Sequence, residues 1–295
     1  MKKYRPKKQT NKALTSKKVD VVNGIKDGMY WQIYDINLFS RDKSRVLNVL
    51  EKKLASGTKK YWIATVNPEF VMTAQKDEEF KKILSKTSLN VVDGIGLIWA
   101  RELEKRFKKQ DLRFMNKTRK SLLGFMTGVE VLRGKYKDQV ASGADLIIDL
   151  VKMAQKTDKK IFLLGGWGER AQKMAEFLMT NYQISNKNIE WSEGEPNVAN
   201  SQVVKKINKF KPDILLVAYG MKKQEFWIDK NLKVIDVGLV MGVGRSFDYY
   251  SGELKRAPFW VRKTGLEWLY SLIKEPKRFK RQLVLPKFIL RVLYN

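Results

Sequence analysis

The sequence predicts an α/β protein with a three-layer, Rossmann-like fold, built on a mostly parallel sheet and followed by a C-terminal amphipathic helical appendage. Two observations support this prediction. Short apolar runs of strand length alternate with longer segments of helical periodicity, which is typical of a sheet covered by helices on both faces. The chain has 295 residues, of which 43% are hydrophobic, and this is enough to bury a full core.

The clearest βαβ unit spans residues 61–96. Two apolar runs of strand length flank a segment with helical periodicity. The first run ends in a pair that commonly starts helices, and the second ends in a small residue that favours a turn. We therefore expect a strand over Tyr61–Val66, a turn at Asn67-Pro68, a helix to about Lys86 and a second strand that ends at Asp93-Gly94.

Polar and small residues stand at the carboxyl ends of both strands of this unit. Thr65 and Asn67 end the first strand, and Asp93 and Gly94 end the second. In an open parallel sheet these ends face the crevice where ligands bind, which favours a substrate site here. The alternative is structural: Asn67 caps the helix, and Asp93 closes a turn with Gly94. The pattern by itself leaves both interpretations open.

The remaining elements continue the alternation on either side of this unit. Strands are expected where apolar runs are short, and helices where periodic segments are longer. No internal repeat is visible. The predicted strands are 19–25, 30–36, 160–166, 188–191, 213–220 and 234–240, and the predicted helices are 40–55, 144–155, 169–182, 199–210 and 224–231.

Three segments differ from the α/β core, which we expect to span residues 19–255. Residues 1–18 are basic and non-periodic, as in a disordered arm. Residues 101–138 are densely basic and then apolar with two glycines, and they are predicted to be an insertion that forms a lid, a membrane-touching hairpin or a surface excursion. Residues 256–295 place Trp and Leu beside clustered Lys and Arg, which is typical of a membrane-associating segment. A terminal helix pair docked on the core is a compatible alternative.

The composition excludes several kinds of chemistry. The chain has no cysteine and no histidine, so it has neither disulfides nor thiolate or imidazole metal ligands, and it lacks the residues of a Ser-His-Asp or Cys-His site. Any acid or base must be Asp, Glu, Lys or Tyr. There is also no DxD triplet to hold Mg²⁺ against a diphosphate. We therefore expect a protein without a metal or cofactor.

The net charge of +28 predicts a polyanionic partner: nucleic acid, an anionic membrane surface or phosphorylated ligands. A Lys-rich composition that only maintains solubility is the alternative. No apolar run reaches the roughly 20 residues that span a bilayer, and the basic N-terminus lacks the apolar segment of a secretory signal. The expected location is the cytoplasmic face of the cell membrane, as a peripheral protein.

The glycines do not form a dinucleotide-binding fingerprint, because neither Gly94-Ile95-Gly96 nor Gly242-Val243-Gly244 continues as GxGxxG. Two glycine pairs, Gly165-Gly166 and Gly242 with Gly244, are nevertheless candidate loops whose backbone N–H groups approach a diphosphate. Arg278 and Arg281 are candidate cations for the same group, since arginine binds phosphate in bidentate fashion. Contact with anionic lipid headgroups is the alternative for both arginines.

Seven motifs, in order along most of residues 20–290, resemble the WecG/TagA/CpsF glycosyltransferase family: NPEFVM, VVDGIGLIWA, SGADL, FLLGG, GMKKQEFWI, MGVGRSFDYYSGELKRAPFWVRKTGLEWLY and KEPKRFKRQLVLPKF. The resemblance implies transfer of an N-acetylhexosamine, such as N-acetylmannosamine or its uronic acid, from a UDP donor. The implied acceptor is a polyprenyl-diphosphate-linked N-acetylglucosamine, and the implied pathway makes teichoic acid, capsule or exopolysaccharide. Family members associate through the core, so a homo-oligomer is an open alternative.

The resemblance also implies roles for individual residues. Asp93 matches the aspartate proposed as general base of an inverting, single-displacement reaction, and Thr65 matches a threonine of the active-site pocket. Gln224 matches a glutamine expected to contact the donor or acceptor sugar. Arg278 and Arg281 match arginines of an appendage that helps to complete the active site at the membrane.

The sequence departs from the family pattern at two places. Ser271 stands where an arginine is common, and the run 139–142 before Gly143 lacks another. Arginines of the predicted insertion are candidate replacements. The missing cations leave an inactive scaffold of the same fold as one alternative. A basic nucleic-acid-binding protein is the other, although no recognised nucleic-acid module occurs in the sequence.

Overall fold

The computed structural model describes residues 29–39, 42–109, 115–194, 196, 201–276 and 279–294. The predicted disordered arm and the predicted strand over 19–25 lie outside these residues, and so does Arg278.

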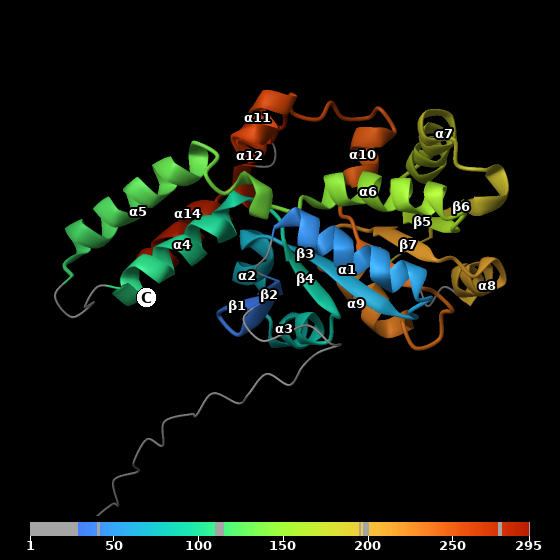
Figure 1. Cartoon of the computed structure of the whole chain (residues 1–295), viewed down its shortest axis with the longest axis horizontal. Coiled ribbons are helices and arrows are strands. Elements are labelled where there is room, and N and C mark those ends of the chain that lie inside the picture. The colour runs from blue at the N-terminus through green and yellow to red at the C-terminus, as the bar shows by residue number, and fades with distance from the viewer. Residues whose placement is uncertain are drawn as a thin grey trace, which may run out of the picture.

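A sheet of eight strands forms the centre of the described part, in the order β1-β2-β4-β3-β8-β7-β5-β6 (Figure 1). Only β1 and β2 pair in antiparallel fashion, and the other neighbours are parallel. This confirms the predicted mostly parallel sheet. The strands are β1 Tyr30–Ile33, β2 Ile36–Phe39, β3 Tyr61–Val66, β4 Leu89–Val92, β5 Ile161–Gly165, β6 Ile189–Ser192, β7 Ile214–Ala218 and β8 Leu239–Gly242.

Helices cover both faces of this sheet, and a separate group of helices extends from one end of it (Figure 1). The predicted three-layer α/β class is therefore confirmed. The helices are α1 Lys43–Ala55, α2 Pro68–Ala74, α3 Glu78–Ser85, α4 Ile95–Lys109, α5 Lys117–Leu132, α6 Gly143–Lys156, α7 Arg170–Tyr182, α8 Ser201–Phe210, α9 Lys223–Asn231, α10 Ser246–Tyr250, α11 Phe259–Lys263, α12 Glu267–Lys274, α13 Phe279–Gln282 and α14 Val284–Tyr294.

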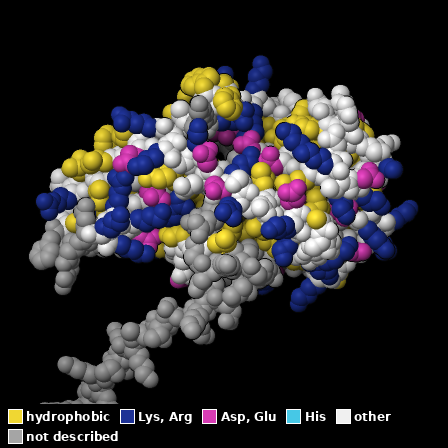
Figure 2. Space-filling model, in the orientation of Figure 1, with side chains coloured by type: hydrophobic (Ala, Val, Ile, Leu, Met, Phe, Trp, Pro, Cys, Tyr) yellow, Lys and Arg dark blue, Asp and Glu magenta, His cyan; other side chains and the backbone are white. Residues whose placement is uncertain are grey.

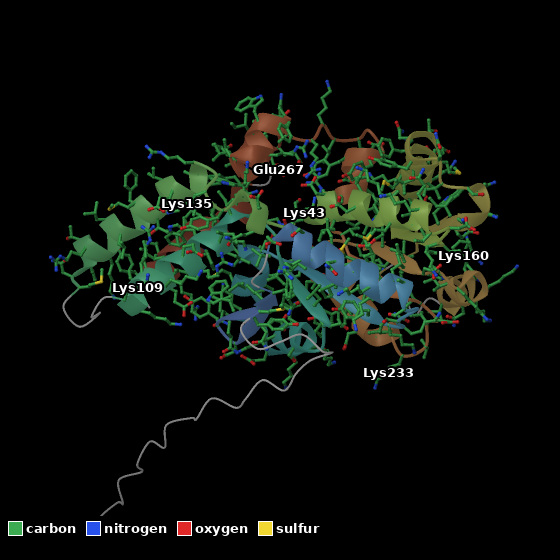
Figure 3. All side chains as sticks on the ribbon, viewed as in Figure 1. Lys43, Lys109, Lys135, Lys160, Lys233 and Glu267 are labelled. Carbon is green, nitrogen blue, oxygen red and sulfur yellow. The ribbon has the colours of Figure 1, made fainter. Side chains whose placement is uncertain are left out.

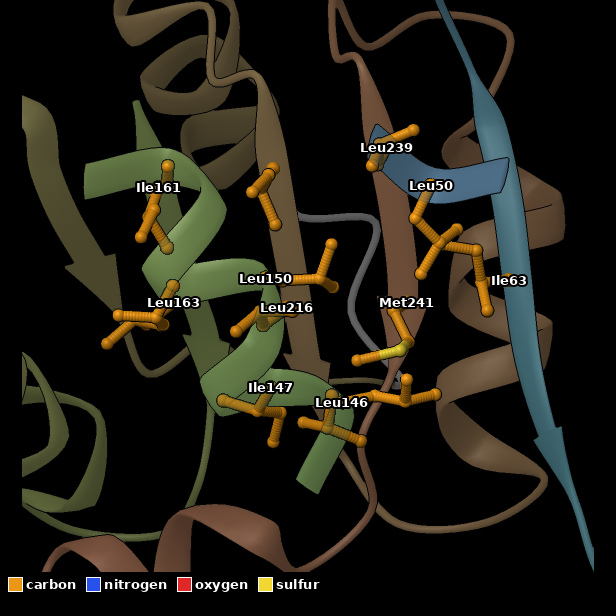
Figure 4. Close-up of a cluster of buried hydrophobic side chains, with 14 of the residues drawn as sticks. Leu50, Ile63, Leu146, Ile147, Leu150, Ile161, Leu163, Leu216, Leu239 and Met241 are labelled. Atoms are coloured by element: carbon orange, nitrogen blue, oxygen red, sulfur yellow. The ribbon is translucent and has the colours of Figure 1, made fainter. Parts of the chain in front are cut away.

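The two faces of the sheet bury different sets of side chains because successive residues of a strand point to opposite faces. On one face, α1, α6 and α7 pack on the strands, while α2, α3, α4, α8 and α9 cover the other. Figure 4 shows the first face, where side chains of α6 lie against those of β5, β7 and β8. The labelled α6 residues there are Leu146, Ile147 and Leu150, and the strand residues are Leu163, Leu216 and Met241.

The prediction of a single strand over 30–36 was wrong, because the chain reverses within it. Tyr34 and Asp35 have φ angles of 46° and 66° and form a two-residue turn between β1 and β2. Positive φ at both central positions is the geometry that hairpin turns require. The sequences Asn-Gly and Asp-Gly predict such a turn, whereas Tyr-Asp does not.

The single helix predicted after Asn67 is two helices. Asn67 caps α2, and its side chain accepts hydrogen bonds from the backbone N–H groups of Glu69 and Phe70. A second cap follows at Asp77, which accepts from the N–H of Phe80 at 3.0 Å and starts α3. Since an Asp cap satisfies the free N–H groups of a new helix, it also ends the preceding one.

The strand predicted over 234–240 begins only at Leu239. The carbonyls of Val237 and Gly238 still accept from the N–H groups of Lys60 and Tyr61, but further upstream the N–H of Asp236 donates to the Asn208 side chain, and Val234 is exposed. The apolar run therefore continues through a loop before it enters the sheet.

Residues 101–138, predicted as an insertion, lie mainly in α4 and α5, which pack against each other beside α14 (Figure 1). The indole N–H of Trp99 donates to the carbonyl of Gly124 at 2.9 Å, and Phe288 of α14 is fully buried among α2 and α4. The C-terminal helix is thus docked on the core, as the structural alternative for this segment stated. Among the described residues, no helix is long and apolar enough to cross a membrane.

Candidate active site

A cavity of about 730 Å³ opens at the carboxyl ends of β3, β4 and β8, and parts of α5, α12, α13 and α14 close its other sides. It lies at the edge of the sheet where parallel strands present a binding crevice. Of the residues predicted from the sequence, those that line this cavity are Thr65, Asn67, Asp93, Gly94, Gln224, Gly244 and Arg281.

The other predicted glycines lie away from the cavity surface. Gly165 ends β5 and lies against Tyr219, and Gly166 follows it and lies against Phe247. Gly242 lies beneath the cavity, and its carbonyl oxygen accepts a hydrogen bond from the Thr65 hydroxyl at 3.4 Å. Arg278 lies outside the described residues. Gly244, but not the Gly165-Gly166 pair, is thus in place for a diphosphate loop.

The start of α6 approaches Thr65 closely. A Cβ added at Gly143 would lie 3.2 Å from the Thr65 hydroxyl oxygen. Only a residue without a side chain fits here comfortably, and this brings the first turn of α6 to the ends of β3 and β4. The N-terminus of a helix carries free N–H groups and a partial positive charge. Here it faces the carboxylate of Asp93, which accepts a hydrogen bond from the Gly143 N–H.

Asp93 has an unusual protonation equilibrium. Its carboxyl lies deep in the protein yet faces the cavity, so it remains partly accessible. Its pKa is raised to about 7: burial is the largest cause, the negative charges of Glu267 and Asp145 also raise the pKa, and Arg256 and the Gly143 N–H lower it. A carboxyl with a pKa near neutrality can accept a proton at pH 7 more readily than an ordinary aspartate. The geometry suits a general base.

The charged groups around Asp93 form a network across distant parts of the chain. Arg256 donates to Asp145 at 2.7 Å and to Glu267 at 3.1 Å. Arg262 also reaches Asp145, at 3.4 Å. Figure 3 labels Glu267 where α12 meets the core, while the labelled lysines lie spread around the rest of the molecule. The network therefore fixes the start of the C-terminal segment to α6 beside Asp93.

A second buried carboxylate orients Gln224. Glu225 has no exposed surface, and its carboxylate accepts from the Gln224 amide at 2.7 Å and from the Lys222 N–H at 2.8 Å. The Gln224 carbonyl in turn accepts from the Gly244 N–H at 2.8 Å. Burial raises the pKa of Glu225 to about 7, against these hydrogen bonds. The chain of contacts aims the Gln224 amide and the Gly244 loop at one side of the cavity.

The backbone beside Gln224 is strained. Lys222 has φ 73° and ψ −55°, a conformation that residues with side chains rarely adopt. Its N–H is held by Glu225, and its ammonium group pairs with Asp77 at 2.6 Å. Strained residues of this kind cluster at functional sites. The loop that carries Gln224 is thus held in a defined geometry.

Two arginines supply positive charge to the cavity, and both are paired with carboxylates. Arg281 donates to Glu69 at 2.6 Å. Arg245 donates to Asp248 at 2.8 Å and to Glu275 at 3.0 Å. Among the residues that the structure describes, no group of three or more Asp and Glu side chains is arranged to hold a metal ion.

The sequence profile of the glycosyl transferase WecG/TagA/CpsF family matches residues 31–116 and 123–295. The chain belongs to this family. The match leaves only residues 117–122 of the predicted insertion outside the profile, at the start of α5.

Curated proteins of two bacteria are similar to the chain over most of its length. A protein of Bacillus subtilis (strain 168) is 29% identical over 261 residues, which are 88% of this chain and 90% of the relative. A protein of Staphylococcus aureus (strain MW2) is 28% identical over 235 residues, or 80% of each chain. Both are named N-acetylglucosaminyldiphosphoundecaprenol N-acetyl-beta-D-mannosaminyltransferase.

Sequence reasoning missed four charged residues of this candidate site: Asp145, Glu225, Arg256 and Glu267. Each lies inside one of the motifs that carry the family resemblance, which was the available signal. Asp145 meets Arg256 only because the fold brings distant segments together, and Glu225 acts through buried contacts with Lys222 and Gln224. Periodicity along the sequence does not reveal such pairs.

Proposed function

We propose that this chain is an inverting, metal-independent glycosyltransferase that uses a UDP-sugar donor. It transfers N-acetylmannosamine, or its uronic acid, to a polyprenyl-diphosphate-linked N-acetylglucosamine. The product enters teichoic acid, capsule or exopolysaccharide synthesis. The names of the curated relatives support the sugar and the acceptor. The observation that carries the proposal is the Asp93 carboxyl, which faces the cavity with its pKa near 7.

Asp93 acts as the base in this reaction. It takes the proton from the acceptor hydroxyl as that oxygen attacks the anomeric carbon of the donor sugar. The new C–O bond forms on the face opposite UDP while the bond to the UDP oxygen breaks, which inverts the anomeric centre. Thr65, Asn67 and Gln224 line the same cavity and offer hydrogen bonds to the two sugars. The protonated Asp93 then releases its proton to water.

Arginines stabilise the departing diphosphate. Arg245 and Arg281 line the cavity, and Arg278 precedes Arg281 by three residues. Charge-assisted hydrogen bonds from guanidinium groups can meet the negative charge that develops on a leaving diphosphate. The N–H groups around Gly244 are a further candidate contact. In this proposal, the arginines take the role that Mg²⁺ has in other sugar-nucleotide enzymes.

The protein acts as a peripheral protein at the cytoplasmic face of the membrane. Its acceptor cannot leave the bilayer, so the enzyme must reach the lipid headgroups. Aromatic and apolar side chains exposed on α11, α12 and α13 support such a contact. The net charge of +28 favours an anionic surface. The same charge would attract nucleic acid, which we expect to bind without specificity.

The test is sugar transfer to a synthetic lipid-diphospho-N-acetylglucosamine acceptor from a panel of UDP-N-acetylhexosamines in the presence of a chelator, with Asp93→Asn alongside. We expect transfer from one donor, unaffected by chelator and lost in Asp93→Asn. Transfer that needs a divalent cation would overturn the metal-independent mechanism. If the folded protein did not bind UDP, the proposal of a UDP-sugar donor would be wrong, and nucleic acid would be the next partner to test.

A further inference from the structure

The cavity has two chemically different halves. Around Asp93 and Gln224 it is polar, whereas between α4, α5 and α14 it is lined by apolar side chains. The two halves are continuous, so a ligand bound at Asp93 can extend into the apolar half. The lining residues used below are Trp99, Phe125, Leu132, Leu285, Ile289 and Leu293.

We propose that the apolar half of the cavity binds the first isoprene units of the acceptor lipid. The acceptor's diphosphate and sugar then occupy the polar half. This inference rests on the proposed function, because it names where the lipid part of the proposed acceptor binds. A hydrocarbon chain gains free energy by leaving water for apolar walls, and these walls start beside the reacting groups.

Trp99 forms an apolar floor for this chain. Its single polar atom, the indole N–H, donates to the Gly124 carbonyl at 2.9 Å, so the ring presents only hydrocarbon to the cavity. Gly124 and Gly128, one turn apart in α5, lie over this ring. A polar ligand would find no unsatisfied partner on Trp99.

Gly124 and Gly128 differ in the reason why a glycine stands at each position. At Gly124, an added Cβ would lie 2.6 Å from the Leu293 side chain, so packing against α14 explains the glycine. At Gly128, an added Cβ would meet only Trp99, at the ordinary distances of 3.8 and 3.9 Å. A glycine inside a helix destabilises it relative to alanine. Packing within the protein therefore does not require Gly128, which lines open space in the cavity that a ligand can fill.

The apolar half leads to an exposed apolar face. Phe125 lines the cavity and is 71% exposed, and Leu122, one turn before it, is 59% exposed. Figure 2 shows hydrophobic side chains gathered over α5, with Lys and Arg around them. This continuity suits a ligand whose far end stays in a bilayer, rather than a small molecule enclosed by protein. Exposed basic residues at the start of α5, Lys117 and Arg119, suit anionic headgroups at the same edge.

The probes for the test are farnesyl diphosphate, which has three isoprene units and no sugar, and inorganic diphosphate. Gly128→Leu fills the space above Trp99. Leucine is a better helix former than glycine, so α5 is expected to remain folded, and the thermal unfolding midpoint checks this. Thr118→Leu is the matched control, because it adds a leucine to an exposed position of α5 outside the cavity.

We expect the wild-type protein to bind farnesyl diphosphate at least about tenfold more tightly than inorganic diphosphate. Gly128→Leu should remove most of this difference and leave UDP binding unchanged, and Thr118→Leu should behave as the wild type. The inference would be overturned if the wild type bound farnesyl diphosphate and inorganic diphosphate with equal affinity. It would also be overturned if Gly128→Leu bound farnesyl diphosphate as tightly as the wild type does. A dimer in sedimentation that Gly128→Leu dissociates would overturn it too, because a second copy would then fill the groove.

The failure of this inference is separable from that of the proposed function. Sugar transfer without any preference for farnesyl diphosphate would leave the enzyme reaction intact and remove the lipid subsite. A preference for farnesyl diphosphate that Gly128→Leu abolishes, in a protein that transfers no sugar, would leave the subsite and remove the reaction.

Discussion

At the scale of single residues, the proposed mechanism rests on a carboxyl whose neighbours set its proton affinity. Asp93 faces Glu267 from α12, Asp145 and the Gly143 N–H from α6, and Arg256 from the loop before α11. Two negative charges oppose one positive charge and one N–H. This balance, together with burial, keeps the pKa of Asp93 near 7. At neutral pH, a base with this pKa is partly ionised and accepts a proton readily.

Glu267→Gln should move the pH dependence of sugar transfer. Removing this negative charge lowers the pKa of Asp93, so the acidic limb of the kcat/KM profile, expected near pH 7, should shift to lower pH. The maximal rate should fall because the base is weaker. Glu253→Gln, which removes an equal charge that does not act on Asp93, is the control. An unchanged acidic limb in Glu267→Gln would contradict this account.

Asp93→Asn should stabilise the protein at high pH. The ionised carboxylate is disfavoured in the folded state, so the wild type loses stability as the pH rises from about 4 through about 7. The neutral amide avoids this loss. We expect the variant's free energy of unfolding to exceed that of the wild type by on the order of 2–4 kcal/mol at pH 8, but to match it near pH 4. Denaturant unfolding at both pH values measures this, and a difference independent of pH would refute the shifted pKa.

At the scale of elements, α13 meets the start of α2 through one ion pair. Arg281 donates to Glu69, and both side chains keep contact with solvent. An exposed pair of this kind contributes only about 0–1 kcal/mol, so a diphosphate can displace Glu69 from Arg281. The pair therefore holds the arginine at the cavity without blocking it.

This arrangement predicts opposite effects for its two partners. Arg281→Ala should weaken UDP binding by about tenfold or more, because a charge-assisted hydrogen bond is lost. Glu69→Gln should tighten it, by up to about fivefold, because the competing carboxylate is gone. Titration calorimetry with UDP measures both, and Lys81→Ala is a cation control, because Lys81 pairs with Asp35 and does not line the cavity. Weaker UDP binding in Glu69→Gln would contradict the displacement.

The elements also show how far the sequence could predict this protein. Parallel strands and the crevice at their carboxyl ends follow from apolar runs, and this rule places Thr65, Asn67 and Asp93 correctly at one edge. The β1–β2 hairpin was missed because Tyr34 and Asp35 adopt positive φ without the usual turn residues. The network around Asp93 was missed because Arg256 and Arg262 pair with Asp145, more than a hundred positions away, and local patterns carry no information about such pairs.

At the scale of the whole molecule, charge and exposed apolar surface act together. The net charge is +28, and Figure 2 shows Lys and Arg scattered across the visible face. Hydrophobic side chains gather over α5 and again over α11, where Phe259 and Trp260 are 71% and 69% exposed. In the proposed membrane contact, charge would attract the protein to an anionic surface over a Debye length, and burial of aromatic side chains would hold it there.

The two contributions predict different responses to salt. Binding to anionic vesicles should fall steeply between about 50 mM and about 500 mM salt, because screening removes the electrostatic part. The binding that remains at high salt should depend on the aromatic pair. A double variant, Phe259→Ser with Trp260→Ser, should therefore lose most binding at high salt and less at low salt. Vesicle cosedimentation measures this, with Val234→Ser, an exposed apolar residue on a distant loop, as control.

Neutral vesicles and an oligonucleotide separate this account from its competitors. Neutral vesicles offer no charge to attract the protein. The wild type should therefore bind them weakly at any salt concentration, and Phe259 and Trp260 should supply most of that binding. An oligonucleotide should compete at low salt but lose at high salt, because it offers no apolar interior for Phe259 and Trp260 to enter. Oligonucleotide binding that survives high salt and requires neither aromatic would instead favour nucleic acid as the partner of this basic surface.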